Sequence, residues 1–161
     1  MSNRIFFYPD FRRYVLFTVD VLDYMYAHIQ RRLWQKEAGG ENYTIDPDAH
    51  GIIITAATGP NPDDRRRRHS FNPDIDAVAR DRDRQFALGR HSMGLWHTHP
   101  EACPAPSELD RRTTEQYLES FRGDRDRYLM VILGNHGDPP NMVVWSAGRN
   151  DRSRWLELME A

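Results

Sequence analysis

The chain has a single cysteine, Cys103, among its 161 residues. One cysteine excludes an intrachain disulfide and any site built on a Cys-x-x-Cys pair, and this usage suits a reducing compartment. Long hydrophobic runs are also missing, because the apolar stretch from Tyr14 to Phe17 is short and soon meets Asp20 and Asp23. We therefore expect neither a secretory leader nor a membrane span, and a cytoplasmic location is the default.

Neither sign of charge dominates the chain. The 22 basic and 24 acidic residues leave a net charge of -2, which gives no reason to expect a nucleic acid or a membrane surface as a partner. The hydrophobic fraction of 39% is low for a globular protein but lies above the disordered range. The length fits one domain over residues 1–161 with one compact core.

Apolar periodicity predicts an α/β domain in which helices flank a mixed sheet. Strands are expected over residues 14–17, 43–45, 51–55, 91–97, 128–133 and 142–145. Helices are expected after Thr18 or Asp20, from Pro73 or Asp74 toward Gly89, from Ser107 to about Phe121, and over a short stretch from Trp155 to Met159. The pair Gly39-Gly40 breaks the first helical pattern, and no internal repeat is present.

The same pattern predicts which side chains are buried and where regular structure stops. One side of the second helix should face the core, and it carries Ile75, Val78, Ala79 and Phe86. Burial is the usual use of tryptophan, so we expect core or core-edge positions for Trp34, Trp96, Trp145 and Trp155. Regular structure is not expected between Thr58 and Pro73, because that stretch combines Gly59-Pro60-Asn61-Pro62 with the run Arg65 to Arg68.

The most informative stretch of the chain contains two histidines two residues apart, His97 and His99. Residues two apart on a strand face the same side, so both imidazoles can bind one metal ion. Asp110, on the first turn of the next predicted helix, can add an oxygen ligand, and this ligand set suits zinc with a fourth position left for water. Ser107 lies three residues before Asp110 and can donate to an oxyanion beside the metal.

A metal-activated water also needs a proton acceptor. Glu37 and Glu41 are the only glutamates before His97. We assign the role to Glu37, because it stands directly before Ala38-Gly39-Gly40, where small residues allow close approach of the backbone. Glu41 remains the alternative base.

Together these residues resemble a known signature. An upstream glutamate, His97-x-His99-Pro100 and Ser107-x-x-Asp110 fill every position of the JAMM motif of MPN+ or JAB-domain metallopeptidases. The wider resemblance extends over 37–40, 57–74 and 97–110, and points to bacterial JAB proteins encoded beside ubiquitin-like conjugation systems, some of them in antiphage defence. In one respect the chain departs from the family, since the polar residues Glu41-Asn42 follow the glycine pair in place of an apolar strand.

The resemblance implies a cytidine-deaminase-like MPN/JAB architecture with His97, His99 and Asp110 as zinc ligands and Glu37 and Ser107 as catalytic residues. It also implies a zinc isopeptidase or peptidase that cleaves after the C-terminal tail of a ubiquitin-like modifier. A ubiquitin-like protein or its conjugate would be the partner, and the cognate conjugation enzymes are candidates too.

Several alternatives stay open. The enzyme could instead hydrolyse a small amide or a sulfur-carrier peptide, and a non-catalytic MPN scaffold is disfavoured because the ligands are retained. The run Arg65 to Arg68 is interpreted as a solvated loop, with binding to an acidic partner face or a phosphate as the alternative. Cys103 is expected to have no role. The remaining histidines are interpreted as ordinary core or surface residues, namely His28, His50, His69, His91 and His136.

Overall fold

The computed structural model describes residues 1–149 and 152–161. Its main sheet is built from β1 (Arg4–Phe7), β2 (Tyr14–Phe17), β3 (Gly39–Thr44), β4 (Gly51–Ala57), β7 (His91–Thr98), β8 (Arg127–Gly137), β9 (Pro140–Gly148), β10 (Leu156–Glu157) and β11 (Met159–Glu160). A separate hairpin joins β5 (Arg65–Arg67) to β6 (Ser70–Asn72). The helices of the described residues are α1 (Val19–Tyr26), α2 (Ile75–Ala87) and α3 (Glu108–Ser120), with a 3-10 turn at Arg152–Arg154.

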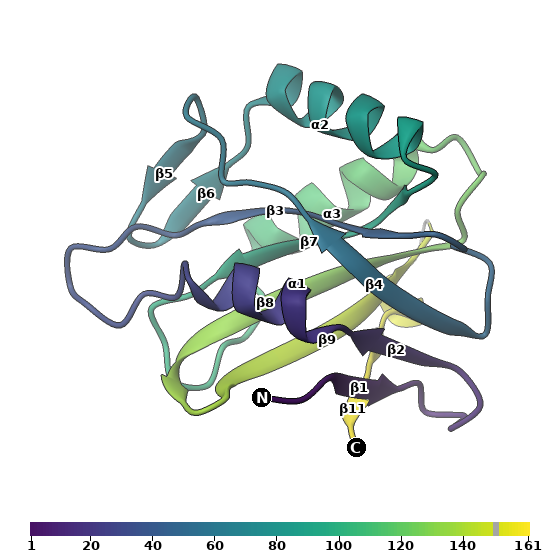
Figure 1. The fold of residues 1–161 in the computed structure, drawn as a ribbon, viewed down its shortest axis with the longest axis horizontal. Helices are drawn as coiled ribbons and strands as arrows, with labels where there is room; N and C mark the ends of the chain where they lie inside the picture. Colours follow the sequence, from purple (N-terminus) through teal and green to yellow (C-terminus); the bar gives the residue numbers. More distant parts are fainter. Residues whose placement is uncertain (150–151) are drawn as a thin grey trace.

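The main sheet has nine strands in the order β10-β9-β8-β7-β3-β4-β2-β1-β11 (Figure 1). β2 pairs in parallel with β4, and β7 pairs in parallel with β8, whereas the other neighbours are antiparallel. This mixed α/β sheet is the class that the sequence predicted. Its central neighbours, β3 and β7, come from distant parts of the chain.

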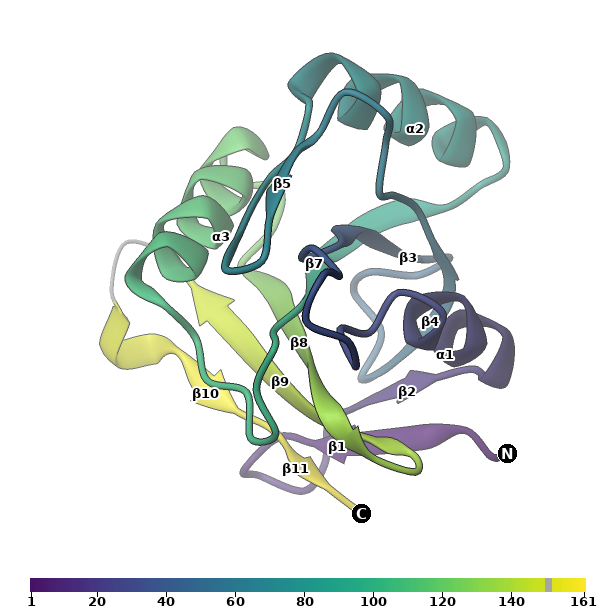
Figure 2. The ribbon, with the colours of Figure 1, turned by 90° about the vertical axis from the view of Figure 1, so that its left-hand side faces the viewer.

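The helices cover both faces of the sheet (Figure 2). On one face α1 buries Val21, Leu22 and Met25 in a cluster that includes Trp96. On the other face α3 contributes Leu118 to a second cluster with Met130. β7 and β8, in the middle of the sheet, are therefore buried on both sides, which explains the apolar stretch Tyr128 to Leu133 of β8.

The helix starts follow the expected capping chemistry. Asp74 caps α2 by accepting from Ala77 N at 3.1 Å, and Ser107 caps α3 in a reciprocal capping box with Asp110. Each cap satisfies backbone N–H groups that have no partner inside the helix. The predicted strands at 14–17 and 91–97 and the predicted helix from Ser107 to about Phe121 are confirmed to within a residue or two.

The two ends of the chain differ from the prediction. β1 was not predicted, and its Arg4 is buried because it forms an ion pair with Glu160 at 2.6 Å. The predicted helix from Trp155 to Met159 is wrong, since this segment forms β10 and β11. The reason is that β9 and β1 would otherwise have unpaired backbone N–H and C=O groups at the two edges of the sheet. The C-terminal segment forms hydrogen bonds with these groups, as β10 on β9 and as β11 on β1.

The predicted absence of regular structure between Thr58 and Pro73 is also wrong. β5 pairs with β6 in a hairpin, with Arg66 opposite Phe71. The hairpin forms despite its arginines because its backbone is held from outside: Glu37 N donates to Arg67 O at 2.8 Å. Strand formation here depends on a neighbouring segment and not on local propensity.

The predicted buried side of α2 is wrong at three of its four residues. Ile75 and Phe86 are 76% and 68% exposed and Ala79 is exposed, whereas Val78 is buried together with Ala77 and Asp81. Polar contacts set the rotation of this helix. Asn61 donates to the buried Asp81 at 3.0 Å, and Arg82 reaches the buried Glu41.

Trp34 is a further correction, because its side chain is 74% exposed. Trp96 and Trp155 are buried and Trp145 is half-buried, as predicted for the core and its edge. Among the described residues, no helix has both the length and the apolar character needed to cross a membrane.

Candidate metal centre

The end of β7 places the two histidines in the middle of the sheet. His97 and His99 are 7% and 6% exposed, and His97 pairs with Gly39 of β3 on one side and Ile132 of β8 on the other. A Cβ atom at Gly39 would lie 2.6 Å from Trp96 O and 3.0 Å from His97 Cβ. Glycine at this position therefore leaves room for the strand that carries the histidines.

The start of α3 fixes the third member of the group. Ser107 N donates to Asp110 Oδ2 at 2.7 Å, and Asp110 N donates to Ser107 Oγ at 3.1 Å. This capping box holds the Asp110 carboxylate at the helix N-terminus, where the helix dipole favours negative charge. The residues that shape the helix start are thus the same residues that the sequence analysis assigned to chemistry.

The three side chains converge on one point. His97 Nε2 and His99 Nε2 lie 3.0 Å apart, and each lies 3.2 Å from a different oxygen of Asp110. Ligand atoms at about 2.0–2.2 Å from a tetrahedral ion are separated by roughly 3.3–3.6 Å. The observed spacing is close to that separation, so the group fits a single metal ion of this size.

The charges of the group are mutually stabilised. Burial raises the pKa of Asp110, but hydrogen bonds from His97 and His99 outweigh burial and hold that pKa well below its usual range. For His99, burial lowers the pKa while Asp110 and Glu37 raise it, with a net rise. A carboxylate that stays ionised is the form that binds a cation.

Glu37 lies beside this group, between α1 and β3. Its side chain is 4% exposed, which rules out a solvated helix end, and its main chain is fixed because Arg66 Nε donates to Glu37 O at 2.7 Å. Burial raises the pKa of Glu37, His99 lowers it, and Asp110 and Glu101 raise it, so that the net pKa is about 8. Such a carboxyl group is suited to accept and return a proton near neutral pH.

Comparison with protein families agrees with this geometry. The model of the prokaryotic homologs of the JAB domain matches residues 18–148. The chain belongs to this family. The match includes His97 at the end of β7, His99 directly after it, and the helix start with Asp110.

Two curated relatives of this JAB domain are similar over most of their length. A protein named CD-NTase/cGAS isopeptidase, from Pseudomonas aeruginosa, is 34% identical over 79% of this chain and 81% of its own. A probable metalloprotease of Sinorhizobium fredii is 31% identical over 77% of this chain and 78% of its own.

Two solved structures with low sequence identity share the fold of this chain, and they are compared for the fold only. A solution structure from Desulfitobacterium hafniense has a TM-score of 0.63 at 18% identity, covering 90% of this chain and 88% of its own. A second, from Salinibacter ruber, has a TM-score of 0.51 at 22% identity, covering 86% and 85%.

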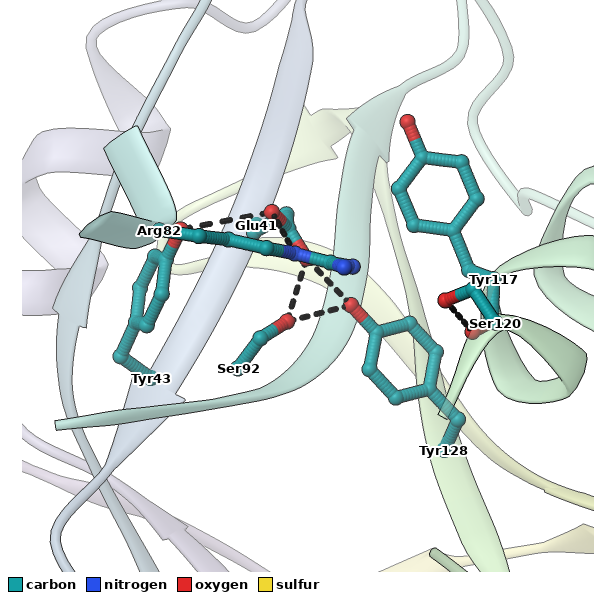
Figure 3. Close-up of polar contacts among 7 residues, drawn as sticks. All are labelled: Glu41, Tyr43, Arg82, Ser92, Tyr117, Ser120 and Tyr128. Atoms are coloured by element: carbon teal, nitrogen blue, oxygen red, sulfur yellow. Dashed lines mark hydrogen bonds and ion pairs between the residues drawn. The ribbon is translucent and has the colours of Figure 1, made fainter. Parts of the chain in front are cut away.

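Glu41, the alternative base, is engaged elsewhere in this JAB domain (Figure 3). Its carboxylate is 1% exposed and forms a salt bridge with Arg82 at 2.7 Å. Ser92 and Tyr128 donate to the same carboxylate, the latter at 2.6 Å. A carboxylate saturated by these donors is not available to move a proton at the metal group.

Two residues near the centre were missed by the sequence analysis. Thr98 lies between the histidines and points to the opposite side of β7, where its hydroxyl accepts from Ala38 N at 3.0 Å and donates to Gln30 at 3.0 Å. It therefore ties the segment after Glu37 to the histidine strand. Glu101 lies 3.8 Å from His99 Nδ1, which is buried without a hydrogen-bond partner in the described chain. The alternation of side chains along β7 could have indicated the position of Thr98, but not that of Glu101.

Cys103, in the loop before α3, is exposed.

Proposed function

We propose that this JAB domain is a zinc-dependent isopeptidase or peptidase that cleaves the bond after the C-terminal tail of a ubiquitin-like modifier. The observation that carries the proposal is the convergence of His97, His99 and Asp110 on one point, with the buried Glu37 beside them. The relative named CD-NTase/cGAS isopeptidase supports the isopeptidase activity, and we place that activity in an antiphage system as part of the proposal. A ubiquitin-like protein or its conjugate is the proposed partner.

Zinc is the proposed ion, because two imidazoles and one carboxylate are typical of catalytic zinc sites that keep a fourth position open. When bound, zinc polarises a carbonyl group and makes a water molecule acidic. Glu37 accepts the proton of the attacking water and returns it to the leaving amine. Burial raises its pKa above the ordinary value, which favours the return of the proton, and a bound cation would favour the ionised form that accepts it.

Ser107 is the proposed oxyanion donor. Its Oγ accepts the Asp110 N–H, so its own hydroxyl hydrogen is directed away from the helix cap. The side chain is exposed, and the Ser107 backbone N–H donates to Asp110, which supports a position near the metal group. A positioned donor of this kind stabilises the negative charge that develops during amide hydrolysis.

The shape next to the metal group favours a thin substrate. A small cleft of about 30 Å³ is lined by Gly40, Phe71, Trp96, His97 and Asp110, among others. We propose that the glycine end of an extended tail approaches the metal group through this cleft, alongside β6, which pairs only with β5 among the described strands. A rigid globular surface cannot reach the centre in this way.

We further propose that residues 1–161 form one domain of cytidine-deaminase-like architecture. Strands from Arg4 to Glu160 take part in one continuous sheet, which supports this organisation. A small-amide or sulfur-carrier hydrolase is the second candidate, favoured by the small volume of the cleft. The scaffold alternative has less support, because the ligand group is retained.

A cleavage assay tests the proposal. Wild type, Glu37→Ala and a control, Glu119→Ala, are incubated with zinc and a bacterial ubiquitin-like protein fused to a reporter; Glu119 is exposed on α3. We expect cleavage by wild type and the control, no cleavage by Glu37→Ala, and inhibition by a chelator. Turnover of a small amide without any cleavage of fusion or conjugate would replace deconjugation by the second candidate.

A further inference from the structure

The arginine run has two kinds of side chain. Arg66 and Arg68 have structural roles: Arg66 holds Glu37, and Arg68 Nη1 donates to Leu33 O at 2.9 Å and to Arg32 O at 3.1 Å. Arg65 and Arg67 are exposed, and within the described residues their guanidinium groups form no hydrogen bond or ion pair. Alternation along β5 thus leaves two arginines free for a ligand.

A second basic segment lies against the hairpin. Residues 31–36 contain Arg31, Arg32 and Lys36, and the Arg68 hydrogen bonds attach this segment to the β5–β6 turn. Figure 2 shows the hairpin beside the segment that connects α1 to β3. We call the cations of both segments the basic rim: Arg31, Arg32, Lys36, Arg65, Arg66, Arg67 and Arg68.

The positive charge of the basic rim is local. Within residues 31–37 and 65–72 the only acidic residue is Glu37, which is buried, although the whole chain has a net charge of -2. The same surface carries Leu33 and Trp34, which are 81% and 74% exposed. Exposed cations next to exposed apolar side chains are typical of an interaction surface.

The basic rim is also joined to the proposed base. Glu37 N donates to Arg67 O at 2.8 Å, and Arg66 donates to Glu37 O at 2.7 Å. A ligand bound by Arg67 would therefore lie close to Glu37 and the metal group. A substrate bound at the metal group could contact the basic rim at the same time.

We propose that Arg65 and Arg67, supported by Arg32 and Lys36, bind acidic residues of the polypeptide substrate beside the scissile bond. The inference rests on the proposed function and adds the charge of the segment that the enzyme selects. A nucleic acid fits less well, because its charges repeat about every 1.7 Å of helix axis. The rim is short and is bordered at Arg65 by a hollow lined with Asp63, Asp74 and Asp76, so the basic surface matches a few acidic side chains and not a continuous polyanion.

Peptide binding to the zinc-loaded full chain tests the inference. The probes are two fluorescent peptides ending in Gly-Gly with a free carboxylate, one rich in Asp and Glu and the other with Asn and Gln at the same positions. We expect the acidic peptide to bind about tenfold tighter, with the difference shrinking as salt rises, since exposed charges are screened.

The variant Arg65→Glu/Arg67→Glu should lose the preference for the acidic peptide, whereas Arg12→Glu should keep it. Arg12 is exposed in the connection between β1 and β2, away from the rim in Figure 1. Circular dichroism and zinc content report whether each variant folds, and Arg65→Gln/Arg67→Gln provides a milder change. Equal binding of both peptides by wild type, or a preference retained in the double variants, would overturn the inference.

Three further outcomes test the kind of ligand and separate the inference from the proposed function. Tighter binding of a single-stranded oligonucleotide of equal charge would overturn the polypeptide assignment. An acidic preference without any cleavage of a fusion supports the rim and contradicts the proposed activity alone. Cleavage of an acidic-tailed fusion with the same KM in wild type and the double variant contradicts the rim alone.

Discussion

Replacing Arg82 with methionine removes the only cation that is bonded to Glu41 within the described residues. Three hydrogen bonds, at 2.7, 2.8 and 3.0 Å, are lost with the guanidinium group. Breaking a buried ion pair on one side costs about 3–5 kcal/mol, because the other charge stays buried. Since Ser92 and Tyr128 still donate to Glu41, we expect the free energy of unfolding to fall by about 3 kcal/mol, at the low end of that range.

Urea unfolding followed by tryptophan fluorescence measures this change. Arg80→Met is the matched control, because Arg80 is exposed on the same helix. Glu41→Gln in the Arg82→Met background should restore part of the lost stability, since the uncompensated charge is removed. A loss below about 1 kcal/mol, equal to that of the control, would refute the reasoning. Zinc content should not change, because no metal ligand is altered.

Three further predictions concern the metal group. Asp110→Ala should lose bound zinc, whereas Glu37→Ala should keep zinc and lose at least about 10²-fold in kcat; metal analysis and kinetics check both, and equal zinc loss would make Glu37 a ligand. Ser107→Ala should lower kcat by about 10²-fold and stability by about 1 kcal/mol, as seen by kinetics and urea unfolding. In the metal-free protein the pKa of Glu37 is raised from 4.5 to about 8, so the folded state holds an extra proton between those values and stability should fall as pH rises through them. Glu37→Gln should flatten that dependence in unfolding experiments at pH 5 and pH 8.

The metal group could be predicted because its determinants are local. The spacing of His97 and His99 at the end of β7 and the cap formed by Ser107 and Asp110 depend on the backbone geometry of one short segment. The choice between Glu37 and Glu41 is not local. It depends on Arg82, a cation on α2, which forms a salt bridge with Glu41.

The errors in the fold have the same origin. The arginine run forms a strand because the backbone of a distant segment pairs with Arg67, and its composition alone favours a loop. The rotation of α2 is set by polar contacts of Asp81 and Arg82, so the apolar pattern of the helix misassigned its buried side. Trp34 is exposed on a segment attached through Arg68, a contact that no periodicity reveals.

The pairing of β3 with β7 also determines the order in which the centre assembles. The three ligands lie within residues 97–110, so an incompletely folded chain can close that short loop around an ion at little entropic cost. Glu37 reaches the metal group only after Gly39 has paired with His97, a contact between distant positions of the chain. Metal capture can therefore precede catalytic competence during folding, and an ion that also binds the unfolded chain stabilises the native state by less than its affinity suggests.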